Sequence, residues 1–475
     1  MKKVIIIFTV TFTVSLGVIA QVNTSYNANT IPIGGTYSAA FGFEALKIST
    51  GNYNTASGVQ ALSKNTAGGY NTATGAQALY SNTTGLQNTA TGTGALYNNI
   101  TGDGNTAHGS SALGWNTQGN NNTANGSSTL LANTTGSGNT ANGSEALYFN
   151  TSGNFNTANG SEALYSNSTG SFNIATGYRA LLFNISGDNN IANGYGALYS
   201  NSTGNFNIAN GYNALFGNTT GNFNIANGYE ALYSFNSNAF GSYNIANGYH
   251  ALYFNSTGSY NTVSGGNSLL FNSTGNNNVA IGDSAGYSNI GSSNIYLGKR
   301  TGYYETGDNK LYIGNDSNKT IIFGDMSSGQ ILLGNQQPNG YSFKGTRTLN
   351  VLGGILADSI RVALGSNWAD YVFADNYRLK PLAELDNFIK ANKHLPNIPS
   401  AEEVAGNGVE LASMNVKLLE KVEELTLYIL QQQKQIQVQQ NSNDLLKEKA
   451  DQLQRNFDSQ QQQIDELRKL IVKLN

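Results

Sequence analysis

Side chains able to perform acid–base or metal chemistry are few in this sequence and stand far apart. The three histidines are His108, His250 and His394, and cysteine is absent from all 475 residues. Because transition-metal sites draw on several His or Cys ligands at short spacing, no metal site is predicted. The charged residues between positions 51 and 290 stand singly and are Lys64, Asp103, Glu145, Glu162, Arg179, Asp188, Glu230 and Asp283. A paired-carboxylate glycosidase site is therefore not predicted, and we expect neither an enzyme nor a cofactor.

The residues with the most regular spacing are aromatic. One stripe comprises Tyr178, Tyr195, Tyr212, Tyr229 and Tyr249, and another comprises Phe155, Phe172, Phe206, Phe223, Tyr243 and Tyr260. Each stripe recurs at one position of a repeat, so its rings are expected to lie one above another. Two interpretations remain open. The rings form a ladder that stabilises neighbouring coils, or the five tyrosines bind a ligand by stacking on sugar rings or on a matrix protein.

The repeat that sets this spacing has seventeen residues and reads approximately Asn-[Thr/Ile]-Ala-x-Gly-x-x-Ala-Leu-Tyr-x-Asn-x-Thr-Gly-x-x. Its leading asparagines are Asn54, Asn71, Asn88, Asn105, Asn122, Asn139, Asn156, Asn173, Asn190, Asn207, Asn224, Asn244, Asn261 and Asn278. Only the interval from Asn224 to Asn244 departs from seventeen, by three residues. A fixed period of this length predicts a solenoid in which each repeat forms one coil.

Each repeat position has a predicted role. The β-branched residue after the leading Asn predicts a short strand. The Ala and Gly that follow predict close approach of another backbone, either across the solenoid or from a neighbouring subunit. The Ala-Leu step, as in Ala78-Leu79, predicts a second short strand with Leu in the interior.

The end of each repeat predicts a turn. In the stretch from Asn82 to Gly85, Asn is expected to bond its own backbone two residues on, and Gly is free to take positive φ. The same slot produces Asn-x-Ser/Thr triplets at Asn82, Asn133, Asn201 and Asn272. Turn chemistry explains these triplets better than N-glycosylation does.

The pattern Asn-x-Ala-x-Gly-x-x-Ala resembles the head repeats of trimeric autotransporter adhesins, the YadA-like heads. The resemblance covers about residues 37–314, although seventeen residues exceed the period usual in that family. It implies that three chains each form a left-handed parallel β-roll.

A heptad pattern begins at Asn415 and continues in one phase to Leu474. The apolar seam residues expected to mediate oligomerisation are Val422, Leu425, Ile429, Ile436, Leu446, Leu453, Ile464, Leu467 and Ile471. Sixty residues at 1.5 Å each predict a helix about 90 Å long, which indicates a coiled coil. Ile or Val at a with Leu at d favours a dimer. A homotrimer is nevertheless preferred, because a parallel stalk must match the symmetry of the head it carries.

The segment before the heptads resembles the C-terminal module of tail-fibre-like surface proteins of Bacteroidetes-type bacteria. The matching stretches are residues 367–373, 377–379, 393–400 and 414–428. Pro381 suits the first turn of a helix through Leu385 and Ile389, residues 394–399 are expected to be extended, and Ser400 to Glu403 form a capping box. The resemblance implies a secreted, fibre-forming surface protein.

These patterns predict a mostly β solenoid, followed by a small α+β connector and a long C-terminal α-helical coiled coil. The expected divisions are a signal peptide at 1–20, an N-terminal cap at 21–36, a β-roll head at 37–318, a neck or linker at 319–347, a connector at 348–410 and a coiled-coil stalk at 411–475. Lys2 and Lys3 before an apolar run, with small residues around Ala20, indicate the signal peptide. An uncleaved membrane anchor is the rival interpretation of this segment.

The expected function follows from these parts. A secreted, extracellular protein is predicted, released or held at the cell surface by a partner, with no membrane insertion after signal cleavage. Its net charge of -3 gives no reason to expect nucleic acid or an anionic membrane as partner. We expect a fibrous homotrimeric adhesin that attaches multivalently to glycans, matrix or other cells. The alternative is a purely structural fibre, or a tail-fibre-like component, without ligand binding of its own.

Overall fold

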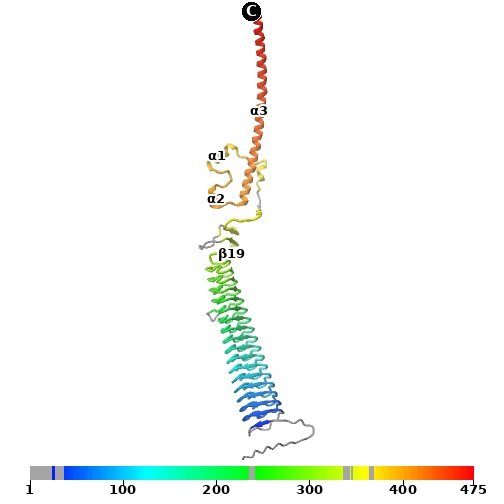
Figure 1. Cartoon of the computed structure of the whole chain (residues 1–475), viewed down its shortest axis with the longest axis vertical. Coiled ribbons are helices and arrows are strands. Elements are labelled where there is room, and N and C mark those ends of the chain that lie inside the picture. Colours follow the sequence, from blue (N-terminus) through cyan, green and yellow to red (C-terminus); the bar gives the residue numbers. More distant parts are fainter. Residues whose placement is uncertain are drawn as a thin grey trace, which may run out of the picture. The chain divides into compact units, whose positions relative to one another are not determined.

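The structure is a computed structural model that describes residues 24–26, 37–234, 241–334, 343, 346–362 and 368–474. The expected signal peptide lies outside the described residues, as does the expected N-terminal cap apart from residues 24–26. The chain divides into two compact units, Met1–Ile355 and Leu356–Asn475. Figure 1 shows the stacked coils of unit 1 and the helices α1, α2 and α3 of unit 2.

Unit 1 is a β-solenoid of about 17 turns with 17-residue repeats, as predicted. Each coil contributes one short strand, which begins at the residue after an Asn in every coil except that of β2, where Ser38 takes this place. The strands are β1 Thr24–Tyr26, β2 Ala39–Phe41, β3 Thr55–Ser57, β4 Thr72–Thr74, β5 Thr89–Thr91, β6 Thr106–His108, β7 Thr123–Asn125, β8 Thr140–Asn142, β9 Thr157–Asn159, β10 Ile174–Thr176, β11 Ile191–Asn193, β12 Ile208–Asn210, β13 Ile225–Asn227, β14 Ile245–Asn247, β15 Thr262–Ser264, β16 Val279–Ile281 and β17 Ile295–Leu297. The strand predicted from the β-branched slot is therefore confirmed.

Neighbouring strands pair in parallel with a shift of one repeat, so equivalent residues lie beside each other. Thr89 pairs with Thr106 and Ala90 with Ala107, for example. The long interval keeps this register, because Ile225 pairs with Ile245. Residues 235–240 of that interval lie outside the described residues. The central residue is a fully buried Ala in β2 to β14 and in β16, and it is a fully buried Val263 in β15 and Tyr296 in β17, so these side chains form one column of the core.

The Ala-Leu step is a turn, so the prediction of a second strand is wrong. Leucines at this step are buried, as expected, but they take left-handed backbone angles, with φ of 52° at Leu79 and 54° at Leu147. A left-handed residue costs roughly 1–2 kcal/mol, and full burial of a leucine offsets this with about 1.5–3 kcal/mol. The backbone still bonds to the next coil, since the N–H of Leu79 donates to the carbonyl of Ala95 at 2.9 Å. The coil thus reverses direction without losing its contact to the neighbour.

The glycine that follows each strand allows two coils of the same chain to approach closely. Gly143 has a φ of 129°, and a Cβ added there would lie 2.6 Å from both the carbonyl carbon and oxygen of Gly160. The slot therefore excludes every side chain. The close approach is between successive coils of the same chain, along the solenoid rather than across it.

Two columns of buried asparagines run through the coils. In the first, the backbone N–H of each leading Asn donates to the Oδ1 of the preceding one, as from Asn156 to Asn139 at 2.9 Å. In the second, Asn150 donates from Nδ2 to the Oδ1 of Asn133 at 2.7 Å and to the carbonyl of Gly153 at 3.0 Å. The expected bond two residues on is wrong, because the amide reaches the glycine three residues on.

This second column contains the Asn-x-Ser/Thr triplets. Asn82, Asn133 and Asn201 are fully buried, and so is Asn272. Their Nδ2 groups donate to the Oδ1 of the equivalent Asn in the preceding coil and to the Gly carbonyl of the same turn. The interpretation of these triplets as turn residues is confirmed.

After the last regular coils the sheet changes direction. The strands here are β18 Lys310–Gly314, β19 Thr320–Asp325, β20 Gln330–Leu333 and β21 Leu349–Val351. β18 pairs with β17 in parallel, β19 lies antiparallel to both β18 and β20, and β21 is parallel to β20. The range expected as a neck thus contains β19 and β20, which extend the sheet of unit 1.

Unit 2 is helical in its described residues. Its elements are the 3-10 helix η1 Ala369–Phe373 and the helices α1 Leu382–Asn392, α2 Ala401–Asn407 and α3 Leu411–Leu474. The capping box is confirmed, with the Ser400 side chain accepting from the N–H of Glu403. The segment expected to be extended contains a turn instead, since Asn397 has a φ of 68° and the N–H of Ile398 donates to the carbonyl of Leu395. Among the described helices, none combines the length and apolarity needed to cross a bilayer.

Candidate functional site

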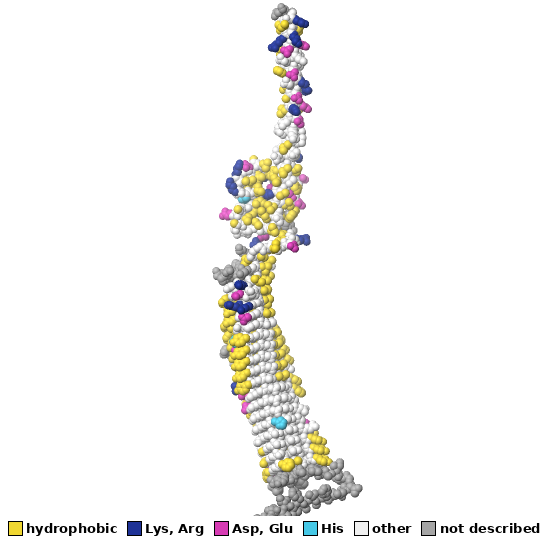
Figure 2. All heavy atoms as spheres, in the orientation of Figure 1, with side chains coloured by type: hydrophobic (Ala, Val, Ile, Leu, Met, Phe, Trp, Pro, Cys, Tyr) yellow, Lys and Arg dark blue, Asp and Glu magenta, His cyan; other side chains and the backbone are white. Residues whose placement is uncertain are grey.

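The five predicted tyrosines form one exposed column, here called the tyrosine ladder: Tyr178, Tyr195, Tyr212, Tyr229 and Tyr249. Each follows the glycine at the end of a strand, so one repeat of register places the rings on consecutive coils. Between 37 and 52% of each residue is exposed. Figure 2 shows hydrophobic side chains in strips that cross successive coils of unit 1.

The rings of the tyrosine ladder stack on one another. Centroids of Tyr195 and Tyr212 lie 5.1 Å apart with an interplanar angle of 11°, and those of Tyr212 and Tyr229 lie 5.0 Å apart at 8°. At one end the guanidinium of Arg179 lies 4.8 Å from the centre of the Tyr178 ring. At the other end the His250 ring stacks on Tyr249 at 3.8 Å. The ring faces are therefore largely occupied within the molecule, and edges and hydroxyl groups are what the ladder presents to a ligand.

Two polar pairs flank the ladder, the Arg179–Glu162 ion pair and a contact of His250 with Glu230, both in the slot next to the tyrosines. Arg179 bonds Glu162 at 2.8 Å, and the Nε2 of His250 lies 2.9 Å from Glu230. The hydrogen bond to Glu162 raises the pKa of Arg179. Partial burial, and then the neighbouring Glu230 carboxylate, raise the pKa of Tyr229. The tyrosine hydroxyl therefore stays protonated near neutral pH and can donate a hydrogen bond to a ligand.

The second predicted stripe forms a separate column, the phenylalanine ladder: Phe155, Phe172, Phe206, Phe223, Tyr243 and Tyr260. Its residues are 44–59% exposed. Phe206 and Phe223 stack at 5.0 Å with an angle of 1°. Asn189 occupies the same slot between Phe172 and Phe206, so this ladder consists of two shorter stacks. Tyr37, Tyr53 and Tyr70 repeat the arrangement in the first coils.

A further aromatic column was not singled out from the sequence. Tyr199, Phe216, Tyr233 and Tyr253 stack at 4.7–5.1 Å in the slot after the buried leucine. The signal was present, because Tyr stands at this slot in the consensus repeat. Burial, followed by the charge of Glu230, raises the pKa values of Tyr233 and Tyr253. His250 lies 4.6 Å from the Tyr253 ring, which joins this column to the tyrosine ladder.

The predicted seam residues all lie on α3, and a large part of each side chain is exposed. The seam comprises Val422, Leu425, Ile429, Ile436, Leu446, Leu453, Ile464, Leu467 and Ile471, with exposed fractions of 43–69%. A helix of 64 residues with an apolar stripe of this length would expose it to water as a single chain. The stripe is a candidate oligomerisation surface.

Among the described residues, no cluster of three or more His, Cys, Asp or Glu side chains is arranged to hold a metal ion. Comparisons of the chain with protein-family models, curated proteins and solved structures find no match. The inference of function consequently depends on the two exposed surfaces, the tyrosine ladder and the α3 seam.

Proposed function

We propose that this chain is a secreted, fibre-forming, adhesin-like surface protein that assembles as a parallel homotrimer through α3. The observation that carries the proposal is the exposed seam of α3. Leu446, Leu453 and Leu467 of α3 are each more than half exposed. Full burial of each such side chain contributes about 1.5–3 kcal/mol, so association of α3 with its own copies has a large driving force.

The trimer is preferred to the dimer because a parallel stalk must have the same symmetry as the head that it carries. A left-handed β-roll in each chain, three of them around one axis, is the arrangement that the repeat resemblance implies. Parallel helices from three chains would continue the same axis. Three copies of each ladder then act together, so a weak site in each chain gains avidity from multivalency.

Attachment is assigned to the tyrosine ladder. A ligand that lies along the ladder meets ring edges, tyrosine hydroxyls and the flanking Glu162–Arg179 and Glu230–His250 pairs. Glycans and extended matrix proteins both present hydroxyl or amide groups that can bond to such a strip, and both are long enough to span several coils. The two pairs add polar groups beside the tyrosine hydroxyls at these positions.

A purely structural fibre is the second candidate, and one observation favours it. The faces of the tyrosine rings pack against one another, with distances between neighbouring ring centroids of 5.0–5.5 Å from Tyr178 to Tyr249. Stacked aromatic pairs contribute about 0.5–1.5 kcal/mol beyond burial. A ladder that serves only stability would have this geometry as well.

The two candidates separate in a binding experiment on the full chain without residues 1–20. Multi-angle light scattering first establishes the oligomer, with three chains expected. A variant with Tyr195→Ala, Tyr212→Ala and Tyr229→Ala is then compared on glycan arrays and matrix-coated surfaces. Loss of retention in this variant, with an unchanged β circular dichroism spectrum, supports attachment through the ladder.

The matched control replaces Phe206, Phe223 and Tyr243 by Ala, which removes an equally exposed ladder from another slot. If the tyrosine variant is still retained, or if retention falls equally in both variants, the structural fibre is the supported function. A monomeric chain in light scattering would contradict the proposed assembly.

A further inference from the structure

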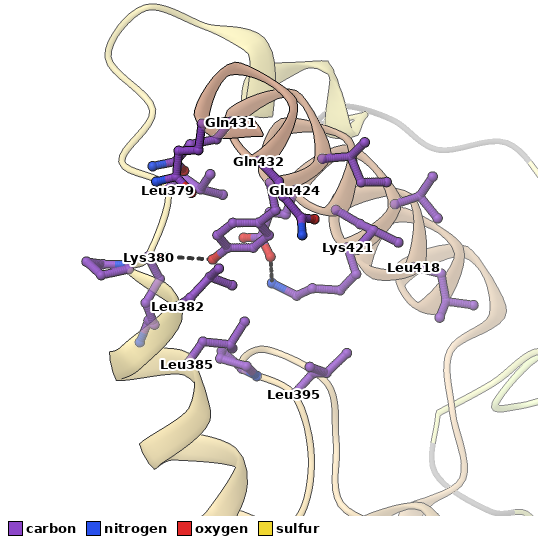
Figure 3. A pocket seen from close by; sticks show the side chains of 17 residues that line it. Leu379, Lys380, Leu382, Leu385, Leu395, Leu418, Lys421, Glu424, Gln431 and Gln432 are labelled. Carbon is purple, nitrogen blue, oxygen red and sulfur yellow. Dashed lines mark hydrogen bonds and ion pairs between the residues drawn. The ribbon is translucent and has the colours of Figure 1, made fainter. Parts of the chain in front are cut away.

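Unit 2 contains a groove of about 1110 Å³ between α3 and the segment from Leu379 to Pro396. One wall is formed by Leu418, Val422, Leu425 and Ile429 of α3. Leu382, Leu385 and Leu395 form the opposite wall, and in Figure 3 they point across the open space towards α3. Both walls are thus apolar, and they come from segments about forty residues apart in the chain.

Polar contacts hold the two walls at a fixed separation. The Tyr428 hydroxyl donates to the carbonyl of Lys380, and the Tyr377 hydroxyl donates to Glu424. Lys421 lines the groove and pairs with Glu424 at 2.9 Å and with Glu420 at 2.6 Å. These bonds satisfy the charged groups at the margin of the groove. Gln431, Gln432 and Gln435 also line the groove on the α3 side, and the rest of the lining is mostly apolar.

The apolar α3 wall of the groove is the beginning of the α3 seam. Val422, Leu425 and Ile429 are 56–58% exposed, and the same stripe continues without a change of phase to Ile471. Any helix that packs on the seam further along α3 and keeps its register must therefore pass through the groove. This continuity selects α3 of another copy as the occupant.

The size and position of the groove agree with that occupant. An α-helix is about 10–12 Å across and rises 1.5 Å per residue, so the groove volume corresponds to about eight residues, or two turns. Lys421, Tyr428 and Gln435 line the groove and occupy the heptad g positions. In parallel coiled coils the g edge of one helix faces the e edge of its neighbour. The e positions here are Leu419, Thr426 and Gln433.

We propose that this groove receives two turns of α3 from a second copy of the chain, so that α1 of each copy clasps the helix of its neighbour. The inference rests on the proposed assembly through α3 and adds an element to it. α1 supplies a second apolar wall, so the oligomer interface includes residues outside α3. Leu385 of one copy then lies beside the e edge of the neighbouring helix, next to its Thr426.

The absence of cysteine allows a direct test by cross-linking. Two versions of the chain with tags of different size, one carrying L385C and the other T426C, are co-expressed and treated with a short bis-maleimide. We expect a covalent product that contains both tags. The matched control replaces T426C by K434C. Lys434 is on the same helix at a heptad f position, which faces away from the seam, and we expect no such product. A separate L425C chain reports contact between seam residues of two α3 helices.

The outcomes separate this inference from the proposed assembly. If L425C cross-links between copies while L385C and T426C do not, the groove inference fails and the assembly through α3 stands. If neither pair cross-links, both fail. Equal products with T426C and K434C would also overturn the groove assignment, because the reaction would not be specific to the e edge.

A second measurement does not depend on cross-linking geometry. Leu382→Ser together with Leu385→Ser removes the apolar α1 wall, and the concentration at which the assembly dissociates is expected to rise at least about tenfold. Val438→Ser is the control, since Val438 is 68% exposed on α3 and lies outside the seam. An unchanged dissociation concentration in the double variant would show that another ligand, or solvent, fills the groove.

Discussion

Replacement of Asn150 by Ala tests whether the buried amide column stabilises the solenoid. Asn150 donates to Asn133 Oδ1 at 2.7 Å and accepts from Asn167 Nδ2 at 2.8 Å. Gly153 keeps a bond from Asn139, and Asn167 keeps its bond to Gly170. The substitution therefore leaves two buried groups without a partner, the Asn133 oxygen and one Asn167 N–H.

Each buried unsatisfied group costs about 1–3 kcal/mol, so a loss of about 3 kcal/mol is expected. Because each coil contacts only its neighbours, the loss is local and is best measured by hydrogen exchange of peptides around residue 150. A fall of about 3 kcal/mol in the opening free energy corresponds to about 100-fold faster exchange. Peptides several coils away should exchange at the wild-type rate.

Asn142→Ala provides the matched control. Asn142 takes part in a chemically identical amide chain, with bonds of 2.8 Å to Asn125 and to Asn159. Its side chain lies on the partly exposed strand face, where water replaces the lost partner, so the change should stay within about 0.5 kcal/mol. Equal exchange rates in the two variants would refute the idea that burial, rather than the amide bond itself, gives the column its stabilising effect.

Four further predictions concern other features of the fold. Gly160→Ala places a Cβ 2.5 Å from the carbonyl oxygen of Gly177 at a φ of 143°, and it should lower the melting temperature sharply in circular dichroism. Gly94→Gln should be tolerated, because Gln60 and Gln77 occupy the same slot with φ near 60°. Tyr212→Ala removes two stacked pairs and should cost about 1–3 kcal/mol in urea unfolding; a cost below 0.5 kcal/mol would show that the ladder contributes little to stability. Hydrogen bonds from Ser327 and Lys310 lower the pKa of Asp325 from 3.8 to about 2. Because the folded-state pKa is depressed, this stabilisation is present above pH 4 and is lost as the pH falls towards 2. Hydrogen exchange in the β18–β19 hairpin, corrected for intrinsic rates, should therefore become faster between pH 4 and pH 2 in the wild type. The Asp325→Asn variant should show no such change.

The parts of the fold that follow from period and residue type could be predicted from the sequence. A β-branched residue, a buried Ala and a Gly in constant register specify one strand and one close contact in every coil. The second strand was wrong for a physical reason. Leucine normally avoids positive φ, so nothing in an Ala-Leu pair signals the left-handed turn that the structure shows at Leu79 and Leu147. The turn is sustained by burial, a tertiary effect that local propensity does not contain.

The candidate surfaces divide in the same way. The constant spacing of Tyr195, Tyr212 and Tyr229 predicts a column of rings. It does not show that each ring face is covered by the neighbouring ring. The seam from Val422 onward was visible as heptads. The groove was not, because the residues opposite the seam, such as Leu385 and Leu395, come from a separate segment whose placement depends on hydroxyl bonds from Tyr377 and Tyr428.

The one-repeat register of the strands has a consequence for how such a chain can change over generations. Loss or duplication of one whole repeat in the gene would join two equivalent coils, and each Ala, Asn and Gly would find an equivalent neighbour. The pairing of Ile225 with Ile245 across a longer interval shows that extra residues are accommodated without disturbing the strands on either side. The number of repeats therefore sets the length of the solenoid. This length changes in steps of about 4.8 Å, while the contacts within every remaining coil stay the same.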